Sequence, residues 1–118
     1  MPTILIVDDH AAFRHEARQL LQAEGFTVIG EAADGEAALS LATRQRPDIL
    51  LLDIGLPDID GFAVADRLAG LQPPISVILT SSRDGATYGS RLSDTAAVGF
   101  LRKDELTGDA IRSLIGAA

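Results

Sequence analysis

Residues 49–61, with the sequence ILLLDIGLPDIDG, join a short apolar run to an aspartate and then to a segment of Gly, Pro and Asp. An unbroken apolar run such as residues 49–52 is typical of a parallel strand that is covered on both faces. Residues 55–61 have the composition of a loop, because Gly, Pro and Asp favour turns. The segment therefore predicts a buried strand over residues 49–53 that ends on Asp53 and leads into a loop.

The same alternation of a short apolar run and an amphipathic stretch recurs along the whole chain. This pattern predicts an α/β fold in three layers, with helices on both faces of a doubly wound, five-stranded parallel sheet. Strands are expected over residues 3–7, 26–32, 49–53, 75–80 and 98–101. Helices are expected over residues 10–24, from 36 to Pro47, from 61 to Pro73, over 84–95 and from 106 onward.

Three of the expected helices carry further local signals. Asp9 directly precedes the first helix and is placed to act as its N-cap. The pattern over residues 84–95 is weak, since Gly85 and Gly89 each cost about 1 kcal/mol relative to Ala in a helix. We therefore expect that helix to be short or mobile. The last helix is expected to bury Ala110, Ile111, Leu114 and Ile115.

Composition limits both the domain organisation and the classes of function. With 118 residues, of which 47% are apolar, the chain is expected to form one domain over residues 1–118. The absence of cysteine excludes a thiol nucleophile and a zinc–thiolate site. A net charge of −7 opposes direct binding to nucleic acid. The apolar runs are too short to span a membrane and the start at Met1 lacks a signal-peptide pattern, so we expect a cytoplasmic protein.

Polar side chains stand at or just after the ends of four of the expected strands. They are Asp8, Asp9, Asp53, Thr80 and Lys103. The carboxyl ends of parallel strands lie at the edge of the sheet where ligands bind. In the strand order 2-1-3-4-5, which we expect, the first and third strands are neighbours. The three carboxylates must then lie within a few ångströms of each other.

Close carboxylates of this kind suit a hard cation that prefers oxygen ligands, and Mg²⁺ is the expected metal. Lys103 balances the remaining charge and can hold a phosphoryl oxygen, while Thr80 offers a hydroxyl donor. Asp53 can act as a nucleophile that forms an acyl phosphate. These residues predict a phosphoryl-transfer site. His10 and His15 are expected on the surface without a role, because nothing else in the sequence forms a metal-binding cluster with them.

Together these residues resemble the receiver domain of bacterial response regulators, which belong to two-component systems, and the resemblance spans the whole chain. The residues that carry it are Asp8, Asp9, Asp53, Pro57, Gly61, Thr80, Phe100 and Lys103. The resemblance implies a flavodoxin-like fold and a phosphoacceptor signalling domain that is not an enzyme, apart from self-catalysed phosphotransfer and autodephosphorylation. It also implies that Asp8, Asp9 and Asp53 hold Mg²⁺ together with the backbone carbonyl of Gly55.

The same resemblance implies how the domain would signal. A sensor histidine kinase or a phosphotransfer protein would supply the phosphoryl group to Asp53. Thr80 and Phe100 would then form a switch that rearranges the face made by the fourth helix, the fifth strand and the fifth helix. That face would control an effector protein or an output domain, or form a phosphorylation-dependent homodimer. The chain would be either a single-domain regulator or the receiver part of a longer protein.

A few positions depart from the family pattern. Asp104 follows Lys103 where many receivers have a proline, and Ser81 follows Thr80 where a small residue is usual. Gly55 occupies a position that is often bulkier in the family, so its loop is expected to be more mobile. Phe100 lacks the hydroxyl of the frequent tyrosine and could equally be ordinary core.

Three other functions remain as alternatives to the receiver interpretation. A haloacid-dehalogenase-like phosphatase also uses a strand-end aspartate and Mg²⁺, but it needs a second aspartate where this chain has Gly55. A flavodoxin-like FMN carrier needs a phosphate-cradling loop after the first strand, which this sequence lacks. A binding module with the receiver fold could be regulated by partner contact alone, without phosphate. The intact acidic residues argue against that alternative.

Overall fold

β3 (Ile49–Asp53) is the central strand of the sheet, and every residue in it is buried. The computed structural model describes residues 1–116. Its five strands are parallel and lie in the order β2-β1-β3-β4-β5, so the expected α/β class and strand order are confirmed. The other strands are β1 (Thr3–Val7), β2 (Thr27–Ala32), β4 (Ser76–Ser81) and β5 (Gly99–Arg102).

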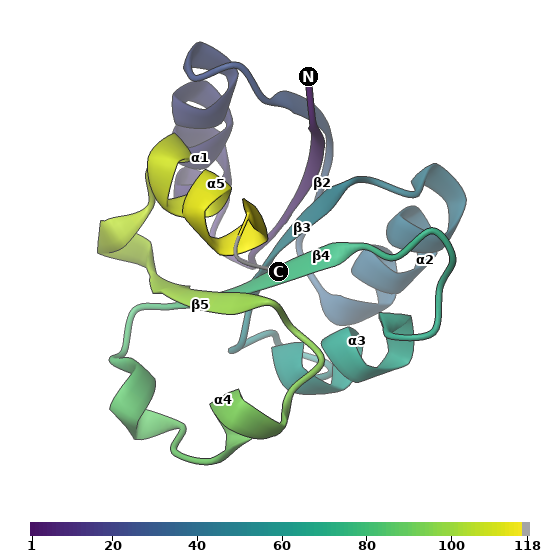
Figure 1. Cartoon of the computed structure of the whole chain (residues 1–118), viewed down its shortest axis with the longest axis vertical. Helices are drawn as coiled ribbons and strands as arrows, with labels where there is room; N and C mark the ends of the chain where they lie inside the picture. Colours follow the sequence, from purple (N-terminus) through teal and green to yellow (C-terminus); the bar gives the residue numbers. More distant parts are fainter. Residues whose placement is uncertain (117–118) are drawn as a thin grey trace.

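Helices cover both faces of this sheet, which gives the expected three layers (Figure 1). They are α1 (Ala11–Ala23), α2 (Gly35–Gln45), α3 (Gly61–Leu68), α4 (Arg91–Asp94) and α5 (Gly108–Gly116). Side chains of β1 alternate between two separate cores, as the period of a strand requires. Ile4 and Ile6 pack with α1 and α5 on one face, and Leu5 and Val7 pack with α2 and α3 on the other.

The segment expected to form the fourth helix contains only short helical pieces. A 3-10 turn, η1 (Gly85–Thr87), is followed by the four-residue helix α4. Gly89 lies between them with a φ of 55°, a left-handed conformation that glycine adopts without the strain imposed by a side chain. The prediction that this helix is short is therefore confirmed.

The prediction that Asp9 is the N-cap of α1 is wrong. His10 occupies the N-cap position, and no side chain there accepts a hydrogen bond from the first turn. The nearby side-chain hydrogen bond comes instead from Asp8, whose Oδ1 accepts from the backbone N–H of His10 at 2.8 Å. Asp9 is left free of the helix and its carboxylate lies near those of its neighbours at the sheet edge.

The last helix begins later and is less buried than expected. A 3-10 turn, η2 (Lys103–Glu105), follows β5, so that α5 starts only at Gly108. Ile111 is fully buried, while the other expected core residues of this helix are partly buried: Ala110, Leu114 and Ile115. The reason is that β5 is an edge strand, and none of its residues is fully buried. Within residues 1–116, no helix is long and apolar enough to cross a membrane.

Candidate functional site

Two buried carboxylates lie side by side at the carboxyl edge of the sheet. β1 and β3 are in parallel register with Val7 opposite Leu52, so that Asp8 and Asp53 follow at the same level. The side chain of Asp8 is fully buried and that of Asp53 is 7% exposed. The carboxylate of Asp9 is one-third exposed, and each of the three places an oxygen within 4.8 Å of the others. The structure thus brings together the three carboxylates that the sequence placed at strand ends.

The ammonium group of Lys103 lies against this pair of buried carboxylates. Its Nζ is 2.7 Å from Oδ2 of Asp8, 3.8 Å from Oδ2 of Asp53 and 4.9 Å from the centroid of the Phe13 ring. Burial raises the pKa of the Asp53 carboxyl above its ordinary value, and the neighbouring Asp8 carboxylate raises it further. Lys103 opposes this shift without reversing it. The Asp53 carboxyl therefore holds a proton more readily than an ordinary aspartate.

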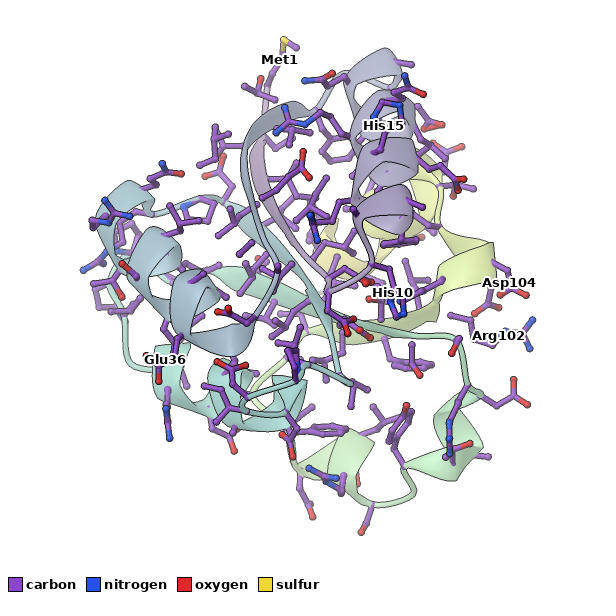
Figure 2. The ribbon with its side chains drawn as sticks, turned by 180° about the vertical axis from the view of Figure 1, so that it is seen from behind. Met1, His10, His15, Glu36, Arg102 and Asp104 are labelled. Atoms are coloured by element: carbon purple, nitrogen blue, oxygen red, sulfur yellow. The ribbon has the colours of Figure 1, made fainter. Side chains whose placement is uncertain are left out.

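His10 belongs to the same cluster, although we expected no role for it. Its Nδ1 is 3.1 Å from Oδ1 of Asp8 and 3.1 Å from Oδ1 of Asp9. Together with Asp53 these residues form a group whose oxygen and nitrogen atoms could hold a metal ion. His10 is exposed, as expected, but the structure places its ring beside carboxylates with which the sequence analysis did not connect it. Figure 2 shows His10 at the base of α1 and His15 farther along the same helix.

Arginines of α1 hold the end of β1 through hydrogen bonds to Glu31 and to the backbone of Asp8. Nη1 of Arg14 donates a hydrogen bond of 2.6 Å to the backbone oxygen of Asp8, and its Nε donates to Glu31 of β2 at 3.1 Å. Nε of Arg18 donates to the second oxygen of Glu31 at 2.6 Å. These hydrogen bonds, first that from Arg18, hold the pKa of the Glu31 carboxyl below its ordinary value. They also set the position from which Asp8 enters the site.

Thr80 lies next to Asp53 in the sheet, because these two residues are paired in the register of β3 and β4. Its side chain is fully buried, and among residues 1–116 its hydroxyl has no hydrogen-bond partner. A buried hydroxyl without a partner costs free energy, which an incoming acceptor would recover. Thr80 is thus placed to donate to a group that joins Asp53.

An aromatic row extends from β5 toward α3. The ring of Phe100 lies 6.0 Å from that of Tyr88, which lies 5.8 Å from that of Phe62. The hydroxyl of Tyr88 is 2.5 Å from Oγ of Ser81, the residue that follows Thr80. Phe100 is only partly buried, so it is not a fully buried core residue. The row connects the strand that carries Thr80 with the segment around α4.

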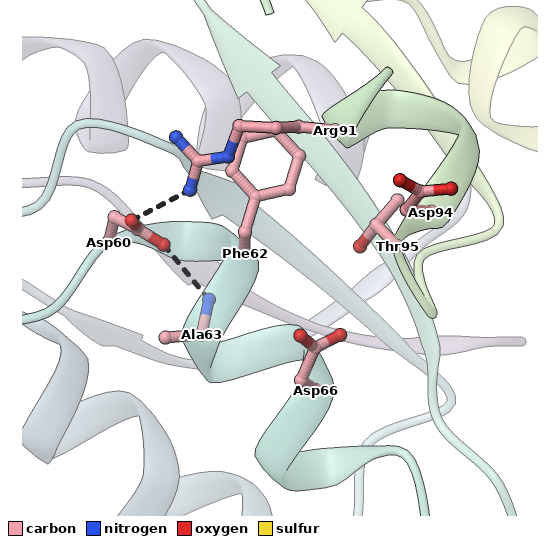
Figure 3. A pocket seen from close by; sticks show the side chains of 7 residues that line it. All are labelled: Asp60, Phe62, Ala63, Asp66, Arg91, Asp94 and Thr95. Atoms are coloured by element: carbon pink, nitrogen blue, oxygen red, sulfur yellow. Dashed lines mark hydrogen bonds and ion pairs between the residues drawn. The ribbon is translucent and has the colours of Figure 1, made fainter.

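A hollow of about 280 Å³ lies between α3 and α4, away from the carboxylates. Arg91 of α4 lies over the ring of Phe62, with its guanidinium carbon 4.2 Å from the ring centroid. It also donates a hydrogen bond of 2.9 Å to Asp60, which in turn caps α3 by accepting from the N–H of Ala63 (Figure 3). These contacts attach α4 to the end of the loop that follows Asp53.

The loop after Asp53 is held at both ends. The carboxylate of Asp58 accepts hydrogen bonds of 2.7 Å and 2.9 Å from the backbone N–H groups of Gly35 and Glu36 at the start of α2. At the other end, the N–H of Gly61 donates to the backbone oxygen of Ile54 at 2.9 Å. Gly61 packs so closely that a Cβ there would lie 2.6 Å from the backbone oxygen of Asp53. Gly55, by contrast, is exposed and a Cβ there would have open space.

We expect Gly61→Ala to destabilise the protein by about 2 kcal/mol, since its methyl group would push against rigid backbone. Gly55→Ala, in the same loop, is the matched control and should change the free energy of unfolding by less than about 1 kcal/mol. Urea unfolding followed by far-UV circular dichroism measures both. Equal effects of the two substitutions would show that the close approach of Gly61 to Asp53 does not constrain the loop.

Ion pairs, instead of a proline, hold the segment after Lys103. Arg102 donates to the carboxylate of Asp104 at 2.5 Å and 2.9 Å and to that of Asp84 at 2.6 Å. The hydrogen bond from Arg102 lowers the pKa of the Asp104 carboxyl. Figure 2 shows Arg102 and Asp104 together at the surface. Because these groups are exposed, the pairs orient the segment more than they stabilise it.

The fold and this arrangement of residues define a receiver domain, and comparison with known families agrees. Residues 4–115 match the model of the response regulator receiver domain, so the chain belongs to that family. Receiver domains are signalling domains, and the phosphatase and FMN-carrier alternatives are set aside on this ground.

The relatives are bacterial regulators. The chain is 35% identical over 104 residues to the response regulator GacA of Pseudomonas aeruginosa, with 87% of this chain and 49% of that protein covered. It is 34% identical over 109 residues to the transcriptional regulatory protein DegU of Brevibacillus brevis, with 92% and 46% covered. The chain thus spans about half the length of the curated relatives that it matches.

Solved structures show the same fold. The signal receiver domain of NarL from Mycobacterium tuberculosis superposes with a TM-score of 0.85 at 32% identity, covering 98% of this chain and 94% of that one. A chain from the structure of the CheX–CheY complex with BeF₃ and Mg²⁺ from Borrelia burgdorferi matches with a TM-score of 0.83 at 26% identity. The match covers 98% of this chain and 87% of that chain.

Proposed function

We propose that this chain is a receiver that accepts a phosphoryl group on Asp53 from a sensor histidine kinase or a phosphotransfer protein. The observation that carries the proposal is the joint placement of three residues. Asp53 ends the central strand, Lys103 lies 3.8 Å from its carboxylate, and the unpartnered hydroxyl of Thr80 belongs to the residue beside it. A nucleophile, a cation and a hydrogen-bond donor then surround one reacting group.

The carboxylates fit a bound Mg²⁺. Oxygens of Asp8, Asp9 and Asp53 lie within 4.8 Å of one another, and the first and last of these residues are buried anions that need a counter-charge. We assign Asp8, Asp9, Asp53 and the backbone carbonyl of Gly55 as the residues that would hold the ion. When bound, Mg²⁺ supplies positive charge to the oxygens of the transferring phosphoryl group.

The chain's own residues then account for the transfer. An oxygen of Asp53 forms a bond to phosphorus as the phosphorus–nitrogen bond of the donor phosphohistidine breaks. Lys103 holds a phosphoryl oxygen as a point charge, and the Thr80 hydroxyl donates to another. Thr80 is held in β4, and Lys103 directly follows β5 with its ammonium group over the ring of Phe13, so little reorganisation is needed during transfer.

Phosphorylation would signal by moving residues on the face of α4, β5 and α5. We propose that Thr80 and Lys103 are drawn toward the phosphoryl group and that Phe100 shifts within its aromatic row. The bond between Ser81 and Tyr88 and the contact of Arg91 with Asp60 would carry this movement to α4. Short helical pieces with few buried residues are suited to such a rearrangement.

This switch predicts a local change in amide hydrogen exchange. With beryllofluoride and Mg²⁺, protection should change over residues 80–105, which include Thr80 and Phe100, and stay constant in α2, which packs mainly against α3, β2 and β1. Mass spectrometry of peptic fragments measures it. Unchanged protection over residues 80–105 in protein that has bound beryllofluoride would contradict the switch.

The output is a partner protein or an output domain. The relatives DegU and NarL, which are named as transcriptional regulatory proteins, are about twice the length of this chain, which supports control of an attached or separate effector. A phosphorylation-dependent homodimer through the same face is a second form of output, and the cytoplasm is the expected location. With a net charge of −7, this domain is not proposed to contact nucleic acid or a membrane itself.

Intact-mass spectrometry after incubation with acetyl phosphate and Mg²⁺ tests the proposed function. One phosphoryl adduct that hydroxylamine removes, and that EDTA prevents, is the expected result. Absence of any adduct with both acetyl phosphate and a phosphorylated donor protein would leave a phosphate-independent binding module as the better account.

A further inference from the structure

The imidazole of His10 stands within the cluster of acidic side chains, at the exposed rim of the cation site. Its Nδ1 is 3.1 Å from Oδ1 of Asp8 and 3.1 Å from Oδ1 of Asp9. The side chain is 69% exposed, so an ion from solvent reaches it directly. Its backbone N–H is bound to Asp8, which fixes the point from which the ring projects.

Both separations are within the range of a hydrogen bond or an ion pair, and they are also those of neighbouring ligands on one ion. In an octahedral site with ligands at about 2.1 Å, adjacent ligand atoms lie about 3.0 Å apart and opposite ones about 4.2 Å. The Nδ1–oxygen distances of 3.1 Å match the first value.

The chemistry of the donors then determines which ions are favoured. Carboxylate oxygen suits Mg²⁺, whereas an imidazole nitrogen adds affinity for Ni²⁺, Co²⁺, Fe²⁺ or Zn²⁺ and almost none for Mg²⁺. Buried Asp8 and Asp53 provide the negative charge that any divalent ion needs. His10 is the residue that would favour an ion that accepts nitrogen over Mg²⁺.

We propose that Nδ1 of His10 is a nitrogen ligand of this site and makes it select borderline first-row divalent cations over Mg²⁺. The inference rests on the cation site of the proposed function and adds to it a metal specificity. The receiver would then hold whichever of these ions is present, with the tighter complex formed by the ion that accepts nitrogen.

Isothermal titration of the full chain with MgCl₂ and with NiCl₂ tests this assignment. The chain has two histidines, and His15 lies exposed on the same helix, so His15→Ala is a matched control for His10→Ala. We expect His10→Ala to weaken Ni²⁺ binding by roughly tenfold or more, on the scale of losing a metal-site partner. The same variant should change the Mg²⁺ affinity by less than about twofold, and His15→Ala should change neither beyond that limit.

A second readout locates the nitrogen. Bound Ni²⁺ is paramagnetic and broadens the NMR signals of a ring that coordinates it. The ring resonances of His10 should therefore disappear from the spectrum, while those of His15 persist. This measurement does not depend on phosphorylation.

The outcomes separate the inference from the function on which it rests. Equal Ni²⁺ affinity in wild type and His10→Ala would overturn the proposal. A parallel loss of Mg²⁺ and Ni²⁺ affinity in His10→Ala would also overturn it, because His10 would then only support the carboxylates. Wild-type protein that binds neither ion would refute the cation site itself, whereas intact Mg²⁺ binding alongside a failed nickel result would leave the proposed function standing.

Discussion

Asp53→Asn is expected to abolish the phosphoryl adduct that acetyl phosphate and Mg²⁺ produce in the wild-type chain. The amide has the shape of the carboxylate but lacks its charge and its nucleophilic oxygen, so no acyl phosphate forms. The variant should remain folded, since it replaces a carboxylate whose pKa is raised by burial and then by the neighbouring Asp8 carboxylate. Intact-mass spectrometry before and after treatment with hydroxylamine measures the adduct.

Asp66→Asn serves as the control for this experiment. Asp66 is an exposed aspartate of α3, away from the cluster, and its replacement should leave the adduct unchanged. An adduct that persists in Asp53→Asn would place the phosphoryl group on another residue. An adduct that disappears in both variants would show that the loss does not come from the nucleophile.

Lys103→Met is expected to destabilise the unphosphorylated protein by about 3 kcal/mol, because it leaves Asp8 as a buried charge without its ammonium partner. Nζ of Lys103 lies 2.7 Å from the fully buried Asp8 carboxylate, and methionine keeps an unbranched apolar chain nearly as long beside Phe13 while removing the charge. Urea unfolding in the absence of divalent ions measures the free energy. Phosphorylation by acetyl phosphate should fall in the same variant.

Two further variants identify the cause of that loss. Asp8→Asn combined with Lys103→Met should recover much of the lost stability, since the double variant no longer buries an unpaired charge. Arg102→Met, at the residue directly before Lys103, removes ion pairs between exposed groups and should cost much less. If the double variant is no more stable than Lys103→Met alone, packing of the lysine and not its charge would explain the effect.

Much of the fold followed from local patterns. The apolar runs of β1 and β3 predicted central strands, because only a strand covered on both faces needs no polar side. The weak pattern around Gly85 and Gly89 correctly predicted a short fourth helix. Prediction failed where tertiary contacts decide the ends of elements. Asp9 directly precedes the first helix in the sequence and so resembled an N-cap. In the structure the N-cap position is His10, and the carboxylate of Asp8 accepts the hydrogen bond from the His10 N–H.

The candidate site divides in the same way. Strand ends placed Asp8, Asp53 and Thr80 at one edge, since parallel strands bring their carboxyl ends together whatever the details of packing. The position of His10 was missed. The sequence Asp8-Asp9-His10 puts the ring beside two carboxylates in the chain, but a side chain at the start of a helix can point in several directions.

By itself the sequence determined the class of fold, the order in which helices and strands alternate, and the residue types available at the sheet edge. These depend on periodicity and on local conformational preference, which neighbouring residues set. Only the tertiary structure decided that Lys103 pairs with Asp8 more closely than with Asp53, that Gly61 touches the backbone of Asp53, and that His10 faces the acidic cluster. Such distances arise from the packing of segments that are far apart in the chain. The sequence of any one of these segments does not predict how it packs against the others.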